Sequence, residues 1–200
     1  MGWITIATKS VKERGKMMND LDFSPFPTLK TNRLLLRKLE MYDDQLIFAY
    51  RSNRDNFPLV DLPVYTKIGE ARSYIKKMNT GLKNNKRLIW AIADIATNKI
   101  LGTISIWNIS TEEAKAELGF GLFPGNLGKG IMSEALKKVV EYGFQIMGLK
   151  TVEAYTNTAN LPSRILLERN NFTKSASFLE TETSDGVPME MVIYQRKSGD

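Results

Sequence analysis

Hydrophobic residues follow two repeating patterns along this chain, one typical of strands and one typical of amphipathic helices. In Leu88–Ile95 two sets of apolar residues alternate over a short stretch, which predicts a strand. In Gly130–Met147 the apolar residues recur at helical spacing over a much longer stretch. The predicted strands are Arg33–Leu39, Leu88–Ile95, Ile100–Ile109, Ala114–Phe123, Thr151–Thr156, Ser175–Glu182 and Met189–Arg196, and the predicted helices are Tyr42–Arg51, Lys67–Asn79, Gly130–Met147 and Pro162–Asn170.

The order of these elements predicts an α/β fold, more closely an α+β mixed sheet, with about seven mostly antiparallel strands and about four flanking helices. The helix Gly130–Met147 is a crossover, so the strands on either side of it should be parallel neighbours. We expect one domain over residues 29–197. Residues 1–28 then form an N-terminal extension and a lead-in that contains Pro25 and Pro27.

The composition excludes several kinds of site. The 200 residues include no Cys and no His, which rules out disulfides, Cys/His zinc sites, cysteine nucleophiles and histidine bases. We therefore expect no metal. The formal net charge of +6 favours anionic ligands but does not choose between a phosphate, an RNA and a solvated basic surface. No apolar run is long enough to cross a membrane and no secretory signal is evident, so a cytoplasmic protein without membrane contact is expected.

A glycine-containing turn around Gly128, Lys129 and Gly130 is the first candidate binding site. It joins a predicted strand directly to a predicted helix, so its backbone N–H groups and the positive end of the helix dipole should face one anion. The pattern does not match a Walker loop, which needs Gly where Phe123 stands and Ser or Thr where Gly130 stands. It does not match a dinucleotide fingerprint either, which needs Gly or Ala where Ser133 stands. A structural turn that binds nothing explains the turn alone equally well.

The start of the last predicted helix is the second candidate. Asn160 is a good N-cap and Pro162 is tolerated in a first turn. Asn171 stands where a left-handed residue would end the helix. An ordinary capped helix explains these residues, but Asn160 and Ser163 could also face the cleft of the glycine turn.

Several segments occur together in one order that resembles the GNAT acetyltransferase superfamily, in particular its branch of ribosomal-protein N-terminal acetyltransferases. They are Arg33–Arg37, Glu117–Phe120, Gly128–Leu136, Asn160–Ser163 and Asn171–Phe172. The resemblance implies a GNAT-like fold in which the central parallel pair is splayed around an acyl-CoA. Two positions depart from the family pattern. Gly125 replaces a Gln or Arg before the turn, and Asn171 replaces a Gly.

The resemblance also implies an enzyme that moves an acetyl group from acetyl-CoA to a primary amine, either a protein N-terminal amine of the ribosomal type or a small amine. Ser163 is expected near the cofactor sulfur, although a plain serine at a helix start explains it equally well. Either Glu117 or Glu182 could act as the base, and a surface carboxylate is the alternative for each. The cofactor-binding residues implied are Phe120, Leu122, Phe123, Leu127, Gly128, Lys129, Gly130, Ile131, Asn160 and Ser163.

Two other functions remain open from the residues alone. The chain could be a module that binds acyl-CoA as a sensor without transferring the acyl group. It could instead bind RNA or the ribosome, as the net charge suggests, but it lacks an aromatic RNA-recognition signature, so no direct nucleic-acid binding is expected. As an enzyme it would act on its amine acceptor as a monomer or a homodimer.

Overall fold

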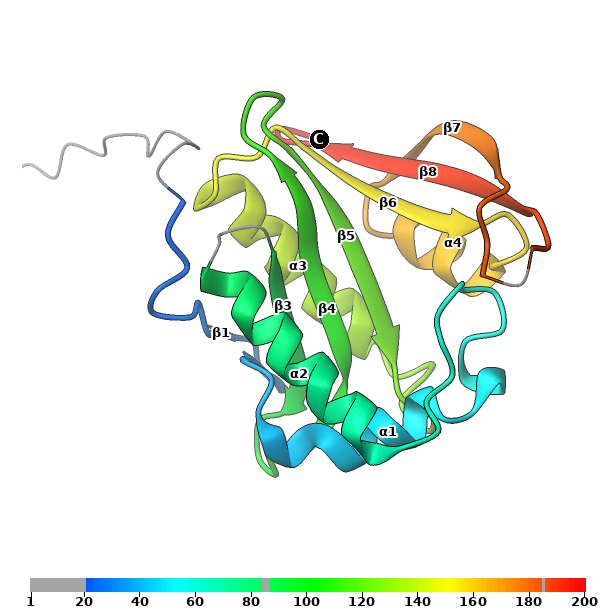
Figure 1. The fold of residues 1–200 in the computed structure, drawn as a ribbon. Coiled ribbons are helices and arrows are strands. Elements are labelled where there is room, and N and C mark those ends of the chain that lie inside the picture. The colour runs from blue at the N-terminus through cyan, green and yellow to red at the C-terminus, as the bar shows by residue number, and fades with distance from the viewer. Residues whose placement is uncertain (1–20, 84–86, 185) are drawn as a thin grey trace, which may run out of the picture.

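The computed structural model describes residues 21–83, 87–184 and 186–200. Its centre is a mixed sheet of eight strands in the spatial order β1-β2-β3-β4-β5-β6-β8-β7 (Figure 1). The strands are β1 Leu29–Lys30, β2 Leu34–Arg37, β3 Leu88–Asp94, β4 Ile100–Ser110, β5 Lys115–Leu122, β6 Thr151–Asn157, β7 Thr173–Glu180 and β8 Met189–Lys197, and the helices are α1 Asp44–Arg51, α2 Ile68–Lys83, α3 Ile131–Gln145 and α4 Leu161–Glu168.

The predicted fold class is confirmed, and every predicted strand and helix is present with small shifts at its ends. The additional strand, β1, has only two residues, which is too short to produce an alternating pattern. The predicted parallel pair is also present, because β5 and β6 are paired in parallel across the helix α3.

The prediction that Glu182 lies in a strand was wrong. Pairing between β7 and β8 ends at Glu180, opposite Met189, so Glu182 lies in the loop that follows. That loop leaves the sheet because Ser184 docks on the connection between α1 and α2, where its backbone N–H and its hydroxyl both donate to Asp61.

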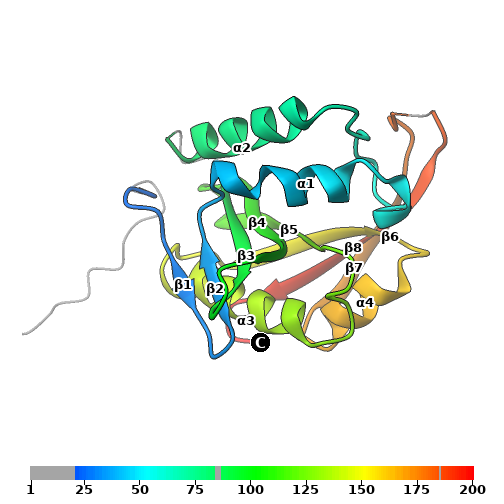
Figure 2. The same cartoon turned by 90° about the horizontal axis from the view of Figure 1, so that it is seen from below.

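Helices cover the two faces of the sheet in pairs, α1 and α2 on one side and α3 and α4 on the other (Figure 2). The main core packs α3 against β3, β4 and β6 and includes Trp90, Ile104 and Leu136. A second core packs α1 and α2 against the other face of β3 and includes Ile75 and Ala91. Strand β3 is buried on both faces, which explains why both of its alternating sets are apolar.

The segment before β1 packs onto the main core. Phe23 is buried, the ring of Phe26 lies edge-on to Trp90 at 6.0 Å, and Trp90 Nε1 donates to the carbonyl of Pro27 at 2.7 Å. Residues 1–20 of the predicted extension lie outside the described residues. The domain boundary at residue 29 stays a prediction.

A buried ion pair fixes the start of α1 against the end of β2. The guanidinium of Arg37 donates to both carboxylate oxygens of Asp43 at 2.8 Å, and the two side chains are only 9% and 2% exposed. Asp43 also accepts the backbone N–H of Glu40, and Arg37 donates to the side-chain oxygen of Asn98. The pair therefore ties β2, the first turn before α1 and the β3–β4 connection together.

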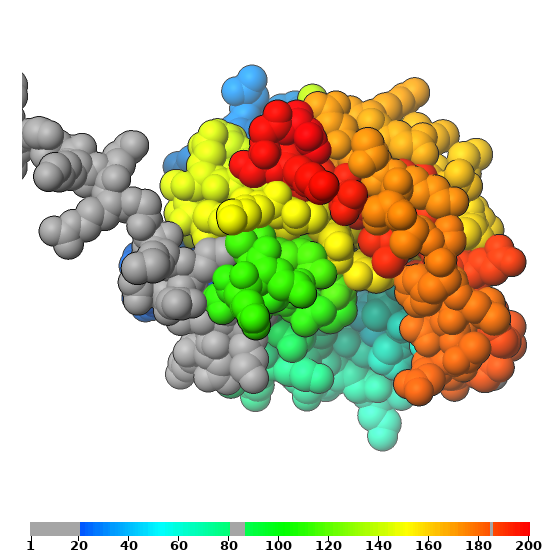
Figure 3. Space-filling model, turned by 90° about the horizontal axis from the view of Figure 1, so that it is seen from above, coloured from blue at the N-terminus to red at the C-terminus, as the bar shows by residue number. Residues whose placement is uncertain are grey.

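The parallel strands β5 and β6 are paired over only part of their length. The pairing joins Lys115 to Thr151, Ala116 to Val152 and Glu117 to Glu153, and then ends although both strands continue. At the paired end, the β4–β5 hairpin, the connection before β6 and the C-terminal residues lie together (Figure 3). Lys150 donates to Ala114, and Ser198 donates to Lys150, which holds this end closed. The other end opens as a wedge (Figure 1).

Candidate active site

Backbone groups of β5 face the wedge between β5 and β6. The N–H of Phe123, just past the end of β5, donates to the carbonyl of Leu101 in β4 at 2.8 Å. Because hydrogen-bonding groups alternate in direction along a strand, the N–H and C=O groups of Leu122 and Phe120 face the opposite edge, toward β6. Their side chains pack against the main core. This part of β5 therefore offers an unpaired strand edge inside the sheet.

The glycine turn lies at the open end of the wedge, between β5 and α3. Gly125, Gly128 and Gly130 have φ values of 81°, 74° and 72°, which a side chain would make costly. Gly130 is the N-cap of α3 and provides no side chain for the first turn. Within the part of the chain that the structure describes, the backbone N–H groups from Leu127 to Ile131 donate to no protein acceptor. They form a cradle of free donors at a helix N-terminus.

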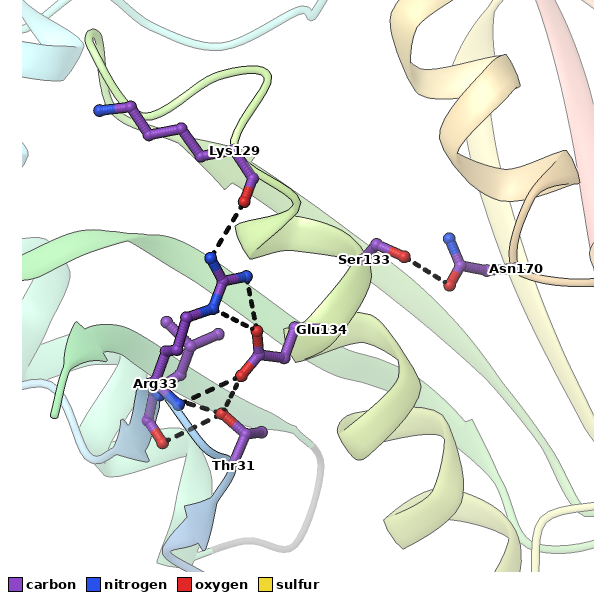
Figure 4. Close-up of polar contacts among 7 residues, drawn as sticks. Thr31, Arg33, Lys129, Ser133, Glu134 and Asn170 are labelled. Carbon is purple, nitrogen blue, oxygen red and sulfur yellow. Dashed lines mark hydrogen bonds and ion pairs between the residues drawn. The ribbon is translucent and has the colours of Figure 1, made fainter.

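Side chains around the turn hold this cradle in place (Figure 4). Arg33 donates to the carbonyl of Lys129 at 3.2 Å and forms an ion pair with Glu134 at 2.7 Å. On the other side of the helix, the hydroxyl of Ser133 donates to the side-chain oxygen of Asn170 at 2.9 Å. Asn126 donates from its side chain to the carbonyls of Leu101 and Phe123. The side chain of Lys129 extends away from these contacts (Figure 4).

The capping predicted for the last helix is present. The side chain of Asn160 accepts the backbone N–H of Ser163 at 3.2 Å. Asn171 has a φ of 64°, and the N–H groups of Asn171 and Phe172 donate to Glu168 and Leu167, the arrangement of a Schellman motif. The helix α4 therefore starts after β6 at the open end of the wedge, and the half-buried Ser163 lies in its first turn.

Glu117 lies on β5 where the pairing with β6 ends. Its carboxylate accepts a hydrogen bond from the side-chain amide of Asn108, which has a φ of 48° at a register shift between β4 and β5. Trp107 is paired with Glu117 across the strands and is 43% exposed. By alternation Glu117 shares a face with Gly119 and Gly121, the face opposite α3.

Tyr155 lies on the same sheet face as Glu117. Its hydroxyl donates to Glu153 at 3.1 Å. Its ring lies edge-on to the ring of Phe178, with 6.2 Å between the ring centroids. Burial, together with the carboxylates of Glu153 and Glu117, raises the pKa of Tyr155 to about 12. The phenol therefore stays protonated over the neutral pH range and can donate a hydrogen bond.

Glu182 does not join this group in the way the sequence suggested. It is exposed in the loop after β7, and its N–H donates to the carboxylate of Glu180. Among the described residues, Glu117 is the predicted base that lies on a strand of the wedge.

The donors of the turn suit a phosphate group. Free N–H groups at a helix N-terminus, with glycines that let a ligand approach the backbone closely, are a recurring anion site. The unpaired edge at Phe120 and Leu122 leads from the wedge to the turn and suits an extended, amide-containing ligand. These residues therefore fit a molecule with an amide-containing arm and a diphosphate, the form of coenzyme A.

Comparison with known proteins identifies the family. Residues 33–173, well over half of the chain, match the family model of the acetyltransferase (GNAT) domain. The protein is a GNAT acetyltransferase. The N-acetyltransferase YoaA of Bacillus subtilis, named as uncharacterized, is 30% identical to it over 169 residues, which cover 84% of this chain and 96% of YoaA.

Solved structures agree with this assignment. A GNAT-family acetyltransferase from Bacillus anthracis superposes with a TM-score of 0.75 at 25% identity and covers 86% of this chain and 98% of its own. RimL, a ribosomal L7/L12 α-N-protein acetyltransferase in complex with coenzyme A, has a TM-score of 0.76 at 19% identity, over 86% of this chain and 98% of its own. At that identity the likeness to RimL shows the fold alone.

The GNAT acetyltransferase has a further feature that its sequence did not indicate. A hollow of about 450 Å³ lies between α1 and the glycine turn, and its lining includes Tyr50, Lys99 and Phe123. A β-carbon at Gly121 would lie 3.4 Å from the hydroxyl of Tyr50, so this hydroxyl reaches the face of β5. Burial raises the pKa of Tyr50, which keeps it protonated at neutral pH. Only the folded contact reveals this placement, because Tyr50 and Gly121 lie far apart in the sequence.

The GNAT acetyltransferase has neither a metal-binding cluster nor a membrane-spanning helix among its described residues. Over residues 21–83, 87–184 and 186–200, no group of three or more His, Cys, Asp or Glu residues could hold a metal ion. In the same described part, no helix has the length and apolar character that crossing a membrane requires.

Proposed function

We propose that this enzyme transfers an acetyl group from acetyl-CoA to a primary amine, with a protein N-terminal amine of the ribosomal-protein type as acceptor and a small amine as the simpler case. The observation that carries the proposal is the wedge between β5 and β6. Its pairing ends at Glu117 and Glu153, and it leads from the unpaired edge of β5 to the free N–H groups of the turn.

The chain would hold the cofactor through its backbone. The edge groups of Phe120 and Leu122 would pair with the pantetheine arm, and the N–H groups from Leu127 to Ile131 would bind the diphosphate. Bound acetyl-CoA supplies a thioester, which an amine can attack. A backbone N–H of β5 in the wedge would stabilise the negative charge that develops on the thioester oxygen.

Proton transfer would use residues on either side of the wedge. Glu117, held by Asn108, would accept the amine proton directly or through a water molecule. Ser163 would donate a hydrogen bond to the leaving sulfur. An α-amino group titrates near pH ~8 and a cysteine-like thiol near ~8.5, so neither step requires a strong base or acid.

The residues around Glu117 support an acceptor amine that is protonated when it binds and then loses its proton to Glu117. The same sheet face carries Glu153, the exposed aromatic side chains of Trp107 and Tyr155, and a hydrogen bond that keeps Tyr155 on Glu153. Carboxylates and aromatic faces both favour an ammonium group. The naming of RimL for a ribosomal protein suggests the protein acceptor, and a cytoplasmic location would follow from it.

Two measurements test the proposal. Calorimetry should detect acetyl-CoA binding to the intact chain, and release of free thiol should follow when peptide amines are added. Peptides with a free N-terminus should react, and the same peptides with a blocked N-terminus and no lysine should not. Absence of acetyl-CoA binding would contradict the whole proposal. Binding without turnover over a broad amine panel would instead favour an acyl-CoA sensor.

A further inference from the structure

We propose that Arg33 is a positioning residue for the cradle, and that it orients the Gly130 N–H toward the cofactor diphosphate by holding the carbonyl of Lys129. This inference rests on the proposed function, because it requires a diphosphate-containing ligand at the turn. It assigns a role to a side chain at the β1–β2 turn, 96 residues before the carbonyl that it holds.

The contacts of Arg33 form a closed network (Figure 4). Its Nη1 donates to the carbonyl of Lys129 at 3.2 Å, while Nε and Nη2 donate to Glu134 at 2.8 and 2.7 Å. The other oxygen of Glu134 accepts the hydroxyl of Thr31 and the backbone N–H of Arg33. Because both ends of the guanidinium are engaged, its position relative to the turn is fixed.

Peptide geometry turns this contact into an orientation. In a planar trans peptide the C=O and the N–H point in opposite directions. The peptide between Lys129 and Gly130 has its C=O held toward Arg33, so the N–H of Gly130 faces away from Arg33. Gly128 and Gly130 could rotate readily because they carry no side chain. A fixed carbonyl removes that freedom before the ligand arrives, which lowers the entropic cost of binding.

The charge of Arg33 is already paired with Glu134. This pairing favours a positioning role for Arg33 over direct attraction of the phosphate. Burial alone raises the pKa of Glu134, but the hydrogen bonds from Thr31 and Arg33 outweigh burial and lower it below its ordinary value. The carboxylate is therefore ionised at neutral pH beside the guanidinium. A free arginine that attracts phosphate would not need this partner, whereas a positioning arginine does.

The other side of the turn has its own support. Ser133 donates to Asn170, which is 2% exposed and also donates to the carbonyl of Leu166. The first turn of α3 is thus fixed to α4 independently of Arg33. Removal of Arg33 should loosen the turn at Lys129 while the helix itself stays in place.

The decisive experiment compares two ligands and two variants. We expect Arg33→Ala to weaken binding of coenzyme A by about tenfold, the effect of one hydrogen bond, as measured by calorimetry. Binding of pantetheine, which lacks the diphosphate, should be unchanged in an NMR titration. The matched control is Arg72→Ala, because Arg72 forms an ion pair with Asp44 at the same 2.7 Å and with a similar exposure of 55% against 54%. The control should bind both ligands like the wild type.

The variant Glu134→Gln should change coenzyme A binding in opposite directions if Arg33 acts by its charge or by its position. If Arg33 acts by charge alone, loss of the nearby carboxylate should tighten coenzyme A binding. If Arg33 acts by position, the amide of Gln loosens the guanidinium and binding should weaken. Arg33→Lys keeps the charge but loses the fork that joins Lys129 to Glu134, so it should show most of the loss seen with alanine.

Several results would overturn the inference. They are equal losses for coenzyme A and pantetheine in Arg33→Ala, no loss for either ligand, an Arg33→Lys variant that binds like the wild type, or unchanged or tighter binding in Glu134→Gln. Each of these leaves the proposed function standing, because the wild type still binds coenzyme A. A wild type that binds no coenzyme A would instead remove the proposed function and this inference together.

Discussion

Asn108 on β4 donates a hydrogen bond to the carboxylate of Glu117 on β5, at the residue where β5 parts from β6. The contact depends on a left-handed residue, because Asn108 has a φ of 48° where the register of the two strands shifts. The hydrogen bond orients the predicted base through one of its two carboxylate oxygens, Oε1. Glu117 is thereby fixed at the closed end of the wedge, where the pairing of β5 with β6 stops.

Replacement of Glu117 by Gln should lower kcat for a peptide amine by about tenfold to a hundredfold, near the lower end of general-base effects. The deficit should be smaller at pH 9 than at pH 7, because an α-amino group that titrates near ~8 then needs less help. The measurement is thiol release against pH. Glu113→Gln, which changes an exposed acid of the same hairpin, is the control and should leave kcat unchanged. Equal rates for Glu117→Gln and wild type at pH 7 would exclude Glu117 as the base.

Gly102→Ala should destabilise the protein by about 1–3 kcal/mol, because a β-carbon there would lie 2.8 Å from Leu122 Cα in the neighbouring strand. Gly69→Ala is the matched control. It lies in α2 with nothing within 4 Å of the new carbon, and alanine should be neutral or stabilise by up to ~1 kcal/mol. Urea unfolding measures both. Equal effects of the two substitutions would contradict the close approach of β4 and β5.

Asp43→Ala should cost about 3–5 kcal/mol, because it leaves the charge of Arg37 buried without its partner. Glu141→Ala removes a carboxylate from an exposed pair with Lys138 and should cost no more than ~1 kcal/mol. Denaturant unfolding of the two variants beside the wild type gives the comparison. A cost near that of Glu141→Ala would show that the Arg37–Asp43 pair does not stabilise the start of α1.

The lowered pKa of Glu134 predicts that the free energy of unfolding depends on pH in the acidic range. Its pKa is lowered in the folded state, so its contribution is complete above the unfolded value of ~4.3 and is lost as the pH falls through the folded value. The free energy of unfolding should therefore fall less steeply below pH ~4.3 in Glu134→Gln than in the wild type. Urea unfolding at several acidic pH values measures the slopes, and parallel curves would contradict the prediction.

The local features of the site could be predicted from the sequence because they depend on single residues. Glycine is favoured where φ is positive, so the turn at Gly128 and Gly130 was identifiable. A side-chain cap needs only Asn160 and the N–H of Ser163, and the helix end at Asn171 needs only a residue that tolerates a left-handed backbone. Strand and helix positions followed from spacing in the same way.

Features that depend on distant contacts could not be predicted. The contact of Arg33 with Lys129 exists only once the β1–β2 turn lies beside the start of α3, and the approach of Tyr50 to Gly121 only once α1 lies on β5. Glu182 was assigned to a strand because its segment has strand-like residues, whereas the contact of Ser184 with Asp61 draws the chain away after Glu180. The separation of β5 from β6 was expected only from the family resemblance.

The wedge leaves the sheet one strand short between β5 and β6, and this has a consequence for association. An unpaired strand edge normally invites the edge of another chain. Here the unpaired groups of Phe120 and Leu122 face inward, while one outer edge, β1, has only two residues. The protein therefore keeps these backbone donors and acceptors free for a ligand inside the sheet, away from its outer edges at β1 and β7.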